Sequence, residues 1–392
     1  MKILMVSTEY PPMKGGVGRY TSHLTNALRK LDIDVYVACN KSGKGDFSGL
    51  SPTNTLNSEV LLKIVNDLKP EIVHIQFEPG MYGLLIDPKN PKKSGTYIDM
   101  FYRKCRTPIV TTFHSGYSLK QWMSQALLIK KTGKTGRFGI PFRFANRFWK
   151  YFLNYTSFKD LNKQKLALSA SGIVFSNYMS KILNGGKVIY HGSEPYLSTT
   201  ITNDEKNHVR SLFSLPADKK IALALGFKTI TKGWDIIEKM EIPDGWTIVI
   251  NSSKSHFNTE DYEFNSTNKN SDNNRIIDLQ KDFLDEKEFS LLFYASDAVL
   301  LPYKVTAGSG VMFDALSHGI PFIASDLSFF KEFASYGLGI TARRNPLAFS
   351  KAIKKLEENY SYYTHNIEKF KQRLKWDYVA NEHKSIYSSI TG

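Results

Sequence analysis

The stretch LLPYKVTAGSGVMFDALSHGIPFIASD, residues 300–326, decides the fold class, because it reads as strand, glycine turn, helix and strand in succession. Two short apolar runs, at 297–301 and 320–324, have the length of buried strands. Between them, the small residues 307–311 open a helix that we expect over 311–317. Amide N–H groups point outward at such a helix start and the helix dipole adds partial positive charge, so the turn suits a phosphate. The alternative is a strand–helix–strand unit whose small residues only permit close packing.

Length and composition indicate a globular protein of two domains. The chain has 392 residues, 42% of them hydrophobic, and a formal net charge of +15. No run approaches the roughly 20 apolar residues of a membrane span, and the chain enters a strand at 3–6 without a hydrophobic leader. We therefore expect a cytoplasmic protein whose positive charge needs an anionic partner or surface. The two cysteines, Cys39 and Cys105, have neither metal-ligand spacing nor the number of a disulfide framework.

Strand and helix patterns alternate along both halves of the chain. In the first half, a strand at 2–7 leads to a glycine turn at 15–18 and then to an amphipathic helix. Further strand patterns in that half lie at 34–39, 72–77 and 108–112. The alternation resumes after residue 210 with strands at 221–225 and 247–251 and a glycine turn at 226–232. Alternation of this kind predicts two α/β domains with parallel, doubly wound sheets.

Two histidines lie near the ends of predicted strands. His74 lies inside its strand, and we interpret it as structural. His114 follows its strand, next to Ser115 and Gly116. Ligands of open α/β sheets gather at the carboxyl ends of the strands, so we interpret His114 as functional.

A basic, aromatic segment at 120–165 departs from the rest of the composition. It holds eleven Lys or Arg residues against one acid, Asp160, and nine aromatic residues lie within 138–158. A helix with this pattern is typical of one that lies on an anionic membrane surface, and we favour that interpretation. A core helix with a solvated basic face and a nucleic-acid patch remain alternatives, of which nucleic acid is the one we do not expect.

Taken in order, the motifs resemble those of GT-B-fold retaining glycosyltransferases of family 4 (glycosyl transferases group 1), along nearly the whole chain. No single motif is decisive, whereas their order and spacing are specific for the fold and family and not for the sugar. The residues that carry the resemblance are Tyr10-Pro11-Pro12, Gly15 to Gly18, Val73-His74, Thr112 to His114, His191-Gly192, Gly226 to Gly233, Leu301-Pro302-Tyr303, Ser309-Gly310-Val311 and Gly319-Ile320-Pro321.

The resemblance implies roles for residues of the second half in binding a nucleotide-sugar donor. Lys232 would hold the diphosphate, and the amides of Ser309, Gly310 and Val311 would bind its terminal phosphate. Asp314 would bind the ribose hydroxyls. The donor would be UDP- or GDP-linked, as a substrate and not as a cofactor.

In the first half, the resemblance implies that Gly16 lets the N-terminal loop approach donor and acceptor. His114 would lie against the donor sugar, and His114 and Lys232 are the expected catalytic residues. No metal is expected, because lysine and backbone amides would take over the task that a cation performs elsewhere.

Two departures from the family pattern affect the donor site. The family commonly has two glutamates separated by seven residues, and Thr306 and Asp314 occupy those places here. The usual arginine after Gly226 is replaced by Phe227, with Lys228 next to it. Lysine is a point charge that does not bind phosphate in a bidentate way, so either Lys228 takes the place of the arginine or the site is weak.

These observations predict a GT-B α/β fold of two doubly wound, Rossmann-like domains that face a cleft, with helices at the C-terminal end. Residues 1–192 would form the acceptor-side domain, including the basic segment, and 193–375 the nucleotide-sugar domain. A last helix at 376–392 would pack back on the N-terminal domain.

The resemblance implies a hexosyltransferase that moves a sugar, with retention, to a lipid-linked glycan acceptor, for cell-surface polysaccharide or glycoconjugate synthesis. It would act at the inner face of the cell membrane. The alternatives are a non-catalytic GT-B partner subunit and a nucleotide-sugar epimerase, for which the sequence offers no convincing pair of acid/base carboxylates.

Overall fold

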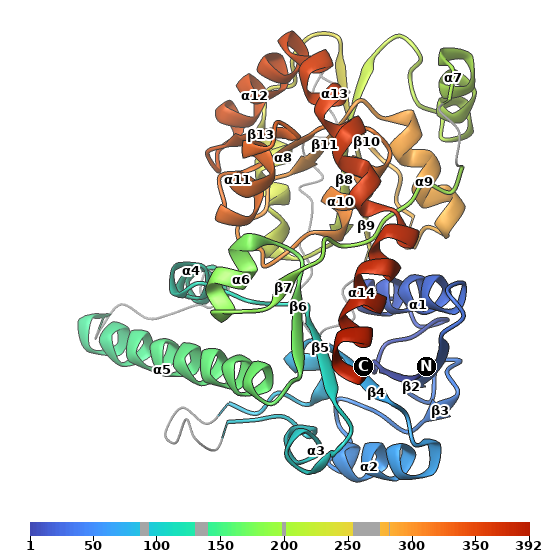
Figure 1. The fold of residues 1–392 in the computed structure, drawn as a ribbon. Helices are drawn as coiled ribbons and strands as arrows, with labels where there is room; N and C mark the ends of the chain where they lie inside the picture. Colours follow the sequence, from blue (N-terminus) through green and yellow to red (C-terminus); the bar gives the residue numbers. More distant parts are fainter. Residues whose placement is uncertain (87–93, 130–139, 198–200, 254–274, 282) are drawn as a thin grey trace. The chain divides into compact units, whose positions relative to one another are not determined.

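The computed structural model divides into two compact units. Unit 1 contains Met1–Gly192 and Trp376–Gly392, and unit 2 contains Ser193–Lys375. Each unit has a parallel sheet flanked by helices, which confirms the predicted pair of doubly wound α/β domains (Figure 1). The described residues are 1–86, 94–129, 140–197, 201–253, 275–281 and 283–392.

The described part of unit 1 contains a seven-stranded sheet in the order β3-β2-β1-β4-β5-β6-β7, and all neighbouring strands run parallel. β1 pairs with β2 on one side and β4 on the other, so the direction of winding reverses between β1 and β4. Ligands of such sheets bind at the carboxyl ends of the strands beside this reversal. The strands are β1 (Lys2–Val6), β2 (Asp34–Cys39), β3 (Phe47–Ser48), β4 (Ile72–Phe77), β5 (Ile109–Phe113), β6 (Ser171–Val174) and β7 (Lys187–Val188).

The last helix of the chain belongs to unit 1. α14 packs against α1, as the red and blue helices of Figure 1 show. It buries Val379, Ile386 and Tyr387, so this packing hides an apolar face that would otherwise meet water. The helices of unit 1 are α1 (Gly16–Arg29), α2 (Asn57–Leu68), α3 (Asp99–Lys104), α4 (Leu119–Ile129), α5 (Ile140–Ala167), α6 (Asn177–Leu183) and α14 (Trp376–Thr391), with a 3₁₀ turn at Pro79–Tyr82.

Unit 2 repeats this architecture. Within its described residues the sheet has six parallel strands in the order β10-β9-β8-β11-β12-β13, and the winding reverses between β8 and β11. Its strands are β8 (Lys220–Phe227), β9 (Trp246–Ser253), β10 (Ile276–Asp278), β11 (Ala298–Leu301), β12 (Phe322–Ser325) and β13 (Gly339–Ala342). Its helices are α7 (Asn203–Leu212), α8 (Trp234–Lys239), α9 (Glu286–Ala295), α10 (Gly310–Ser317), α11 (Ser328–Ser335), α12 (Pro346–Glu358) and α13 (Tyr360–Phe370), with 3₁₀ turns at Ile230–Lys232 and Lys371–Leu374.

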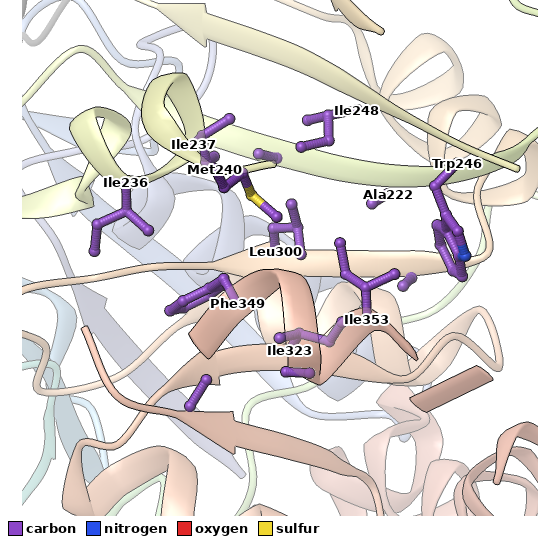
Figure 2. Packing of buried hydrophobic residues seen from close by; sticks show 14 of the residues in the cluster. Ala222, Ile236, Ile237, Met240, Trp246, Ile248, Leu300, Ile323, Phe349 and Ile353 are labelled. Carbon is purple, nitrogen blue, oxygen red and sulfur yellow. The ribbon is translucent and has the colours of Figure 1, made fainter. Parts of the chain in front are cut away.

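One buried hydrophobic cluster of unit 2 lies between its sheet and helices α8, α12 and α13. Trp246, Ile248 and Leu300 come from the strands, and Phe349 and Ile353 come from α12 (Figure 2). All five side chains are at most 1% exposed. Complete burial of an aliphatic or aromatic side chain contributes about 1.5–3 kcal/mol, so this cluster fixes the sheet on which the candidate site is built.

The structure corrects part of the interpretation of the basic, aromatic segment. Lys165, one of the eleven cations, is 1% exposed and forms an ion pair with Asp99 at 2.6 Å. Phe158 is buried, and the rings of Phe158 and Tyr155 pack against Trp122 of α4. These residues serve the packing of unit 1 and are not free to face a membrane surface.

A smaller group on α5 remains at the surface. Trp149 is 58% exposed, and its ring stacks on that of Phe152 at 5.5 Å between centroids. Lys150 beside it is exposed. Residues 130–139 and the side chains of 140–148, Arg143 and Arg147 among them, lie outside what the structure describes. In the described part of the chain, no helix is both long and apolar enough to cross a bilayer.

Buried neutral histidines occupy the interior of unit 1. His74, expected to be structural, is 0% exposed, and its ring nitrogens lie 2.6 Å from Tyr387 Oη and 2.8 Å from Thr112 Oγ1. His383 is also 0% exposed; its Nδ1 donates to the carbonyl of Val379, and its Nε2 has no hydrogen-bond partner. Burial lowers the pKa of His383 to about 4 and that of His74 well below its ordinary value.

We predict that acid destabilises unit 1 through these histidines. The unfolded chain protonates His383 near pH 6.5 while the folded chain does so near pH 4, so the unfolded state binds more protons between these values. The free energy of unfolding therefore falls as pH drops through this window, by about 3 kcal/mol for His383 alone. Denaturant unfolding from pH 7.5 to 4.5 should show a shallower loss in His383→Phe than in the wild type.

The control is His208→Gln, because His208 is exposed on α7. Its pH profile should follow that of the wild type. Identical slopes for His383→Phe and the wild type would contradict the prediction.

Candidate active site

In unit 2, the loop after β8 holds a lysine against a glycine. Gly226 has φ +150°, which favours glycine, and a Cβ there would lie 3.5 Å from Cε of Lys232. The stem of Lys232 therefore lies over Gly226, and its Nζ is 3.8 Å from the ring centroid of Tyr303. The face of an aromatic ring attracts a cation without neutralising it. The Tyr303 ring therefore positions the charged end of Lys232 at the carboxyl edge of the sheet.

Close backbone contacts join this loop to the one after β11. At Gly233 φ is +74°, and a Cβ would come within 2.0 Å of the carbonyl oxygen of Pro302. The amide of Lys304 donates to the carbonyl of Thr231 at 2.8 Å. Since β8 and β11 are neighbours at the winding reversal, the two loops form one rigid edge next to Lys232.

The loop after β11 ends at the start of α10. Ser309 is the N-cap, and its Oγ accepts a hydrogen bond from the amide of Met312 at 3.2 Å. The amides of Ser309, Gly310 and Val311, which the sequence assigns to phosphate, therefore stand at the start of a capped helix, where the dipole favours an anion. Gly308, just before the cap, has no atom within 4 Å of where a Cβ would lie.

Asp314 lies on α10 in a buried polar network. It is 2% exposed, and its Oδ1 accepts a hydrogen bond from Ser193 Oγ at 2.6 Å. Ser193 Oγ also lies 3.0 Å from Ser317 Oγ. The structure thus gives Asp314 a partner within unit 2, and its predicted contact with ribose hydroxyls would have to extend this network or displace Ser193.

The structure also shows local contacts at the two departures from the family pattern. Lys228 extends the pairing of β8 with β9, because its amide donates to the carbonyl of Ser253 at 2.8 Å. Thr306, at the place of the first glutamate, is buried and donates its hydroxyl to the carbonyl of Gly308. Thr306 thus shapes the turn before α10.

In unit 1, a carboxylate of the chain itself lies at the start of α1. Gly18 donates its amide to Glu9 Oε2 at 3.3 Å. A Cβ at Gly15 would come within 2.1 Å of the same oxygen, whereas a Cβ at Gly16 would meet nothing within 4 Å. The sequence predicted that this glycine turn binds a charged group. In the structure, the Glu9 carboxylate of the chain itself accepts a hydrogen bond in the first turn of α1. Gly16 is left with open space and no positive φ, so neither packing nor backbone strain requires glycine there.

His114 follows β5, as predicted, and is held on the edge of the sheet. Its amide donates to the carbonyl of Phe77 at 2.9 Å, and its Nε2 lies 2.9 Å from Gln76 Oε1. An amide oxygen only accepts, so the proton of the neutral ring is on Nε2 and Nδ1 is an acceptor. Burial, reinforced by nearby His191, lowers the pKa of His114 to about 3. The ring is therefore uncharged at neutral pH.

Sequence reasoning missed a second carboxyl in unit 1. Glu78 follows β4, and burial raises its pKa to about 7, while the Ser115 hydroxyl and the Gly80 amide beside it act in the opposite direction. The charge of Glu9 raises the pKa further. The sequence offered no convincing pair of carboxylates, and the structure brings Glu9 and Glu78 close enough to influence each other. The only signal in the sequence was their position, one on each of two loops that follow adjacent strands.

The predicted site residues therefore fall into two sets. Unit 1 contains Gly16 and His114, together with Glu9 and Glu78. Unit 2 contains the others, on the loops after β8 and β11 and on α10: Lys228, Lys232, Ser309, Gly310, Val311 and Asp314. Among the residues that the structure describes, no group of three His, Cys, Asp or Glu side chains could hold a metal ion.

Comparison with known families gives a match within unit 1. Residues 14–160 match the model of Glycosyltransferase Family 4, which covers less than half of the chain. No curated protein matches the sequence.

Solved structures match the whole chain at low identity. Sucrose-phosphate synthase from Thermosynechococcus elongatus has a TM-score of 0.68 at 14% identity, over 99% of this chain and 98% of that one. Anabaena HepE in complex with UDP-glucose has a TM-score of 0.64 at 14% identity, over 99% and 100%. WaaG, a glycosyltransferase involved in lipopolysaccharide biosynthesis, has a TM-score of 0.56 at 14% identity and full coverage of both chains. The fold is therefore that of the GT-B glycosyltransferases.

We predict opposite effects of the two neighbouring glycines on stability. Gly15→Ala should displace the Glu9 carboxylate and lose its bond from Gly18, at a cost of about 1 kcal/mol. Gly15 has φ −171°, an extended conformation open to any residue, so the contact alone sets this cost. Gly16→Ala should leave the free energy of unfolding unchanged or raise it by about 0.5 kcal/mol, because alanine is the better helix former. Denaturant unfolding measures both.

The control uses the Glu9→Ala background, where Gly15→Ala has no carboxylate to displace. The cost of Gly15→Ala should then vanish. An equal cost in both backgrounds would show that Glu9 is not the cause.

Proposed function

We propose that this chain is a glycosyltransferase that moves a hexosyl group from a nucleotide diphosphate donor, UDP- or GDP-linked, to a glycan acceptor. The observation that carries the proposal is the edge of the unit 2 sheet. There the turn over Gly226 presents Lys232, and the adjacent loop ends at the N-terminus of α10. A cation and a helix N-terminus on neighbouring loops suit the two phosphates of a nucleotide diphosphate.

The comparisons support this proposal. The first part of unit 1 resembles family 4 glycosyltransferases, and HepE, of the same fold, has been solved with UDP-glucose bound. Retention of configuration and membership of family 4 are proposed on that resemblance. We also propose that no metal takes part, because Lys232 and the first amides of α10 supply positive charge where the leaving diphosphate gains negative charge.

The remaining residues have distinct proposed roles. Asp314 binds the ribose hydroxyls, and Lys228 adds charge beside the diphosphate. His114, neutral and with Nδ1 as an acceptor, lies against the hydroxyls of the donor sugar. Gly16 lets donor and acceptor approach the loop after β1, in keeping with the open space at its Cα.

We further propose that the acceptor is lipid-linked and that the protein works at the inner face of the cell membrane, in cell-surface polysaccharide or glycoconjugate synthesis. The exposed Trp149, whose ring stacks on that of Phe152, lies next to the exposed Lys150 and supports an interfacial position for α5. Aromatic rings favour the headgroup boundary, and cations favour anionic lipid. WaaG, which shares the fold, is involved in lipopolysaccharide biosynthesis.

One observation favours a second candidate, a nucleotide-sugar epimerase. Glu9 and Glu78 influence each other in unit 1, and the pKa of Glu78 is raised to about 7. Such a carboxyl could transfer protons at neutral pH. Incubation with single nucleotide sugars and no acceptor distinguishes the two, because only an epimerase would convert the sugar. The third candidate, a non-catalytic partner subunit, would leave every donor unchanged.

We predict that Lys232→Ala lowers turnover of the nucleotide sugar about 100-fold, since one electrostatic stabiliser of the leaving diphosphate is worth about 3 kcal/mol. Initial rates of nucleotide release over a panel of UDP- and GDP-sugars measure this effect. Lys239→Ala, an exposed lysine at the end of α8, is the matched control and should retain full turnover. Wild-type turnover in a folded Lys232→Ala variant would remove Lys232 from the mechanism.

We predict that the protein sediments with anionic vesicles and not with neutral ones, and that added salt weakens the binding because the attraction is screened over about 10 Å at 0.1 M. A variant with Trp149→Ala and Lys150→Glu should bind clearly less. Lys63→Glu, which makes the same charge change at an exposed residue of α2, should bind like the wild type. Equal loss in both variants would indicate bulk charge only, and stronger binding to a single-stranded oligonucleotide would favour the nucleic-acid alternative.

A further inference from the structure

Three loops of unit 1 bring together polar groups that the proposed donor chemistry does not use. β1, β4 and β5 are neighbours in the sheet, so the loops that follow them meet at its carboxyl edge. The first loop contributes Glu9, the second Glu78 and the third Ser115. This is the place where the winding of the sheet reverses, which is where ligands of such sheets bind.

Ser115 has a hydroxyl in need of a partner. The residue is 3% exposed, and its Oγ has no hydrogen bond of regular geometry, although it lies beside the Glu78 carboxyl. Burial of a hydroxyl without a good hydrogen bond costs free energy, and a native structure keeps few such groups. A ligand hydroxyl that bridges the two residues would give Ser115 Oγ a hydrogen bond of regular geometry and would add one to the Glu78 carboxyl.

The surroundings leave room for that ligand. A Cβ at Gly80, whose amide lies near the Glu78 carboxyl, would meet no atom within 4 Å. The same is true of Gly16, on the loop after β1. Neither glycine has a positive φ, so neither backbone strain nor packing requires the absence of a side chain. The two glycines lie on the loops that contribute Glu9 and Glu78. A ligand that approaches the backbone of these loops would need such open space.

The charge at this place selects the kind of ligand. The charged residue that acts on Glu78 is Glu9, which has the same sign. A phosphorylated group would be repelled by two carboxylates, whereas a sugar hydroxyl can donate to a carboxylate and accept from a serine. Glu78 is partly ionised at neutral pH, and a hydrogen bond from a ligand hydroxyl would favour its charged form.

We propose that Glu78 and Ser115 bind the acceptor and that they select an uncharged sugar hydroxyl, with the Glu78 carboxylate accepting its hydrogen bond and Ser115 completing the contact. The proposal rests on the proposed glycosyltransferase function and adds the chemical class of the acceptor. It makes Glu78 a binding residue for the acceptor that does not contribute to nucleotide binding.

The experiment separates donor binding from acceptor binding. Glu78→Gln, Ser115→Ala and the control Glu59→Gln, an exposed glutamate on α2, are compared with the wild type. Calorimetry with UDP and with GDP measures nucleotide binding. Transfer from a panel of UDP- and GDP-sugars to neutral methyl glycosides and to the matching sugar phosphates measures acceptor use. Saturation-transfer NMR with the same methyl glycosides measures their binding without any donor.

We expect Glu78→Gln to bind nucleotide like the wild type and to lose about 30-fold in kcat/KM for neutral acceptors, the usual effect of removing a hydrogen bond to a charged group. Ser115→Ala should lose less, and Glu59→Gln nothing. Sugar phosphates should be the poorer acceptors for the wild type. Its transfer rate should fall as pH drops from 8 to 6, because Glu78 becomes protonated, and Glu78→Gln should lack this fall.

Three results would overturn the proposal. One is a Glu78→Gln variant whose kcat/KM and methyl glycoside signal equal those of the wild type. Another is a Glu78→Gln variant that loses nucleotide binding as much as it loses acceptor use, which would make Glu78 structural. The third is conversion of a nucleotide sugar without acceptor by the wild type but not by Glu78→Gln, since the carboxyl would then act in an epimerase. If the wild type bound no nucleotide, the proposed function would fail by itself, and the NMR signal would still decide whether Glu78 binds a neutral sugar.

Discussion

Parallel pairing of strands that are not consecutive in the chain is the constraint on which the rest of the structure depends. In unit 2, Ala222 of β8 stands opposite Ala298 of β11, with β9 and β10 on the other side of β8. Because the winding reverses there, the loops after β8 and β11 leave the sheet side by side. The close contact of Gly233 with the Pro302 carbonyl holds the two loops together, and Lys232 lies over the Tyr303 ring of the second loop. A lysine and a helix N-terminus therefore share one edge of the sheet.

The same constraint in unit 1 produces a different chemical surface. Loops after β1, β4 and β5 carry two carboxyls, a serine hydroxyl and a histidine that burial keeps neutral. Behind them, hydrogen bonds run from His114 through Gln76 and His74 to Tyr387 of α14. This chain of polar side chains ties the edge of the sheet to the last helix of the protein, and each member is fixed by a partner from another element.

The sequence predicted the fold class and those parts of the candidate site that depend on local spacing. Glycine turns next to strand ends indicated the loop after β8 and the start of α10, because backbone conformation is encoded within a few residues, whereas the role of Lys232 came from the family resemblance. Contacts between distant residues left no local pattern. Ser193 donates a hydrogen bond to Asp314, which lies 121 residues further along the chain. Lys165 pairs with Asp99, which lies 66 residues earlier, so sequence reasoning counted Lys165 as a surface cation. Neither Glu78 nor Ser115 belongs to one of the motifs, and only the order of strands in the sheet brings the two residues together.

The assignment of α14 to unit 1 has a consequence for how the protein is made. Residues 193–375 form a compact unit of their own, whereas unit 1 needs residues from both sides of that stretch. During synthesis, every residue of unit 2 is added before Trp376 and the helix that follows it. The first residues of unit 1 are made before unit 2, but the apolar face of α1 stays uncovered until α14 has been made, because α14 is the helix that packs against it. The order in which the two halves are translated is therefore the reverse of the order in which they can be completed.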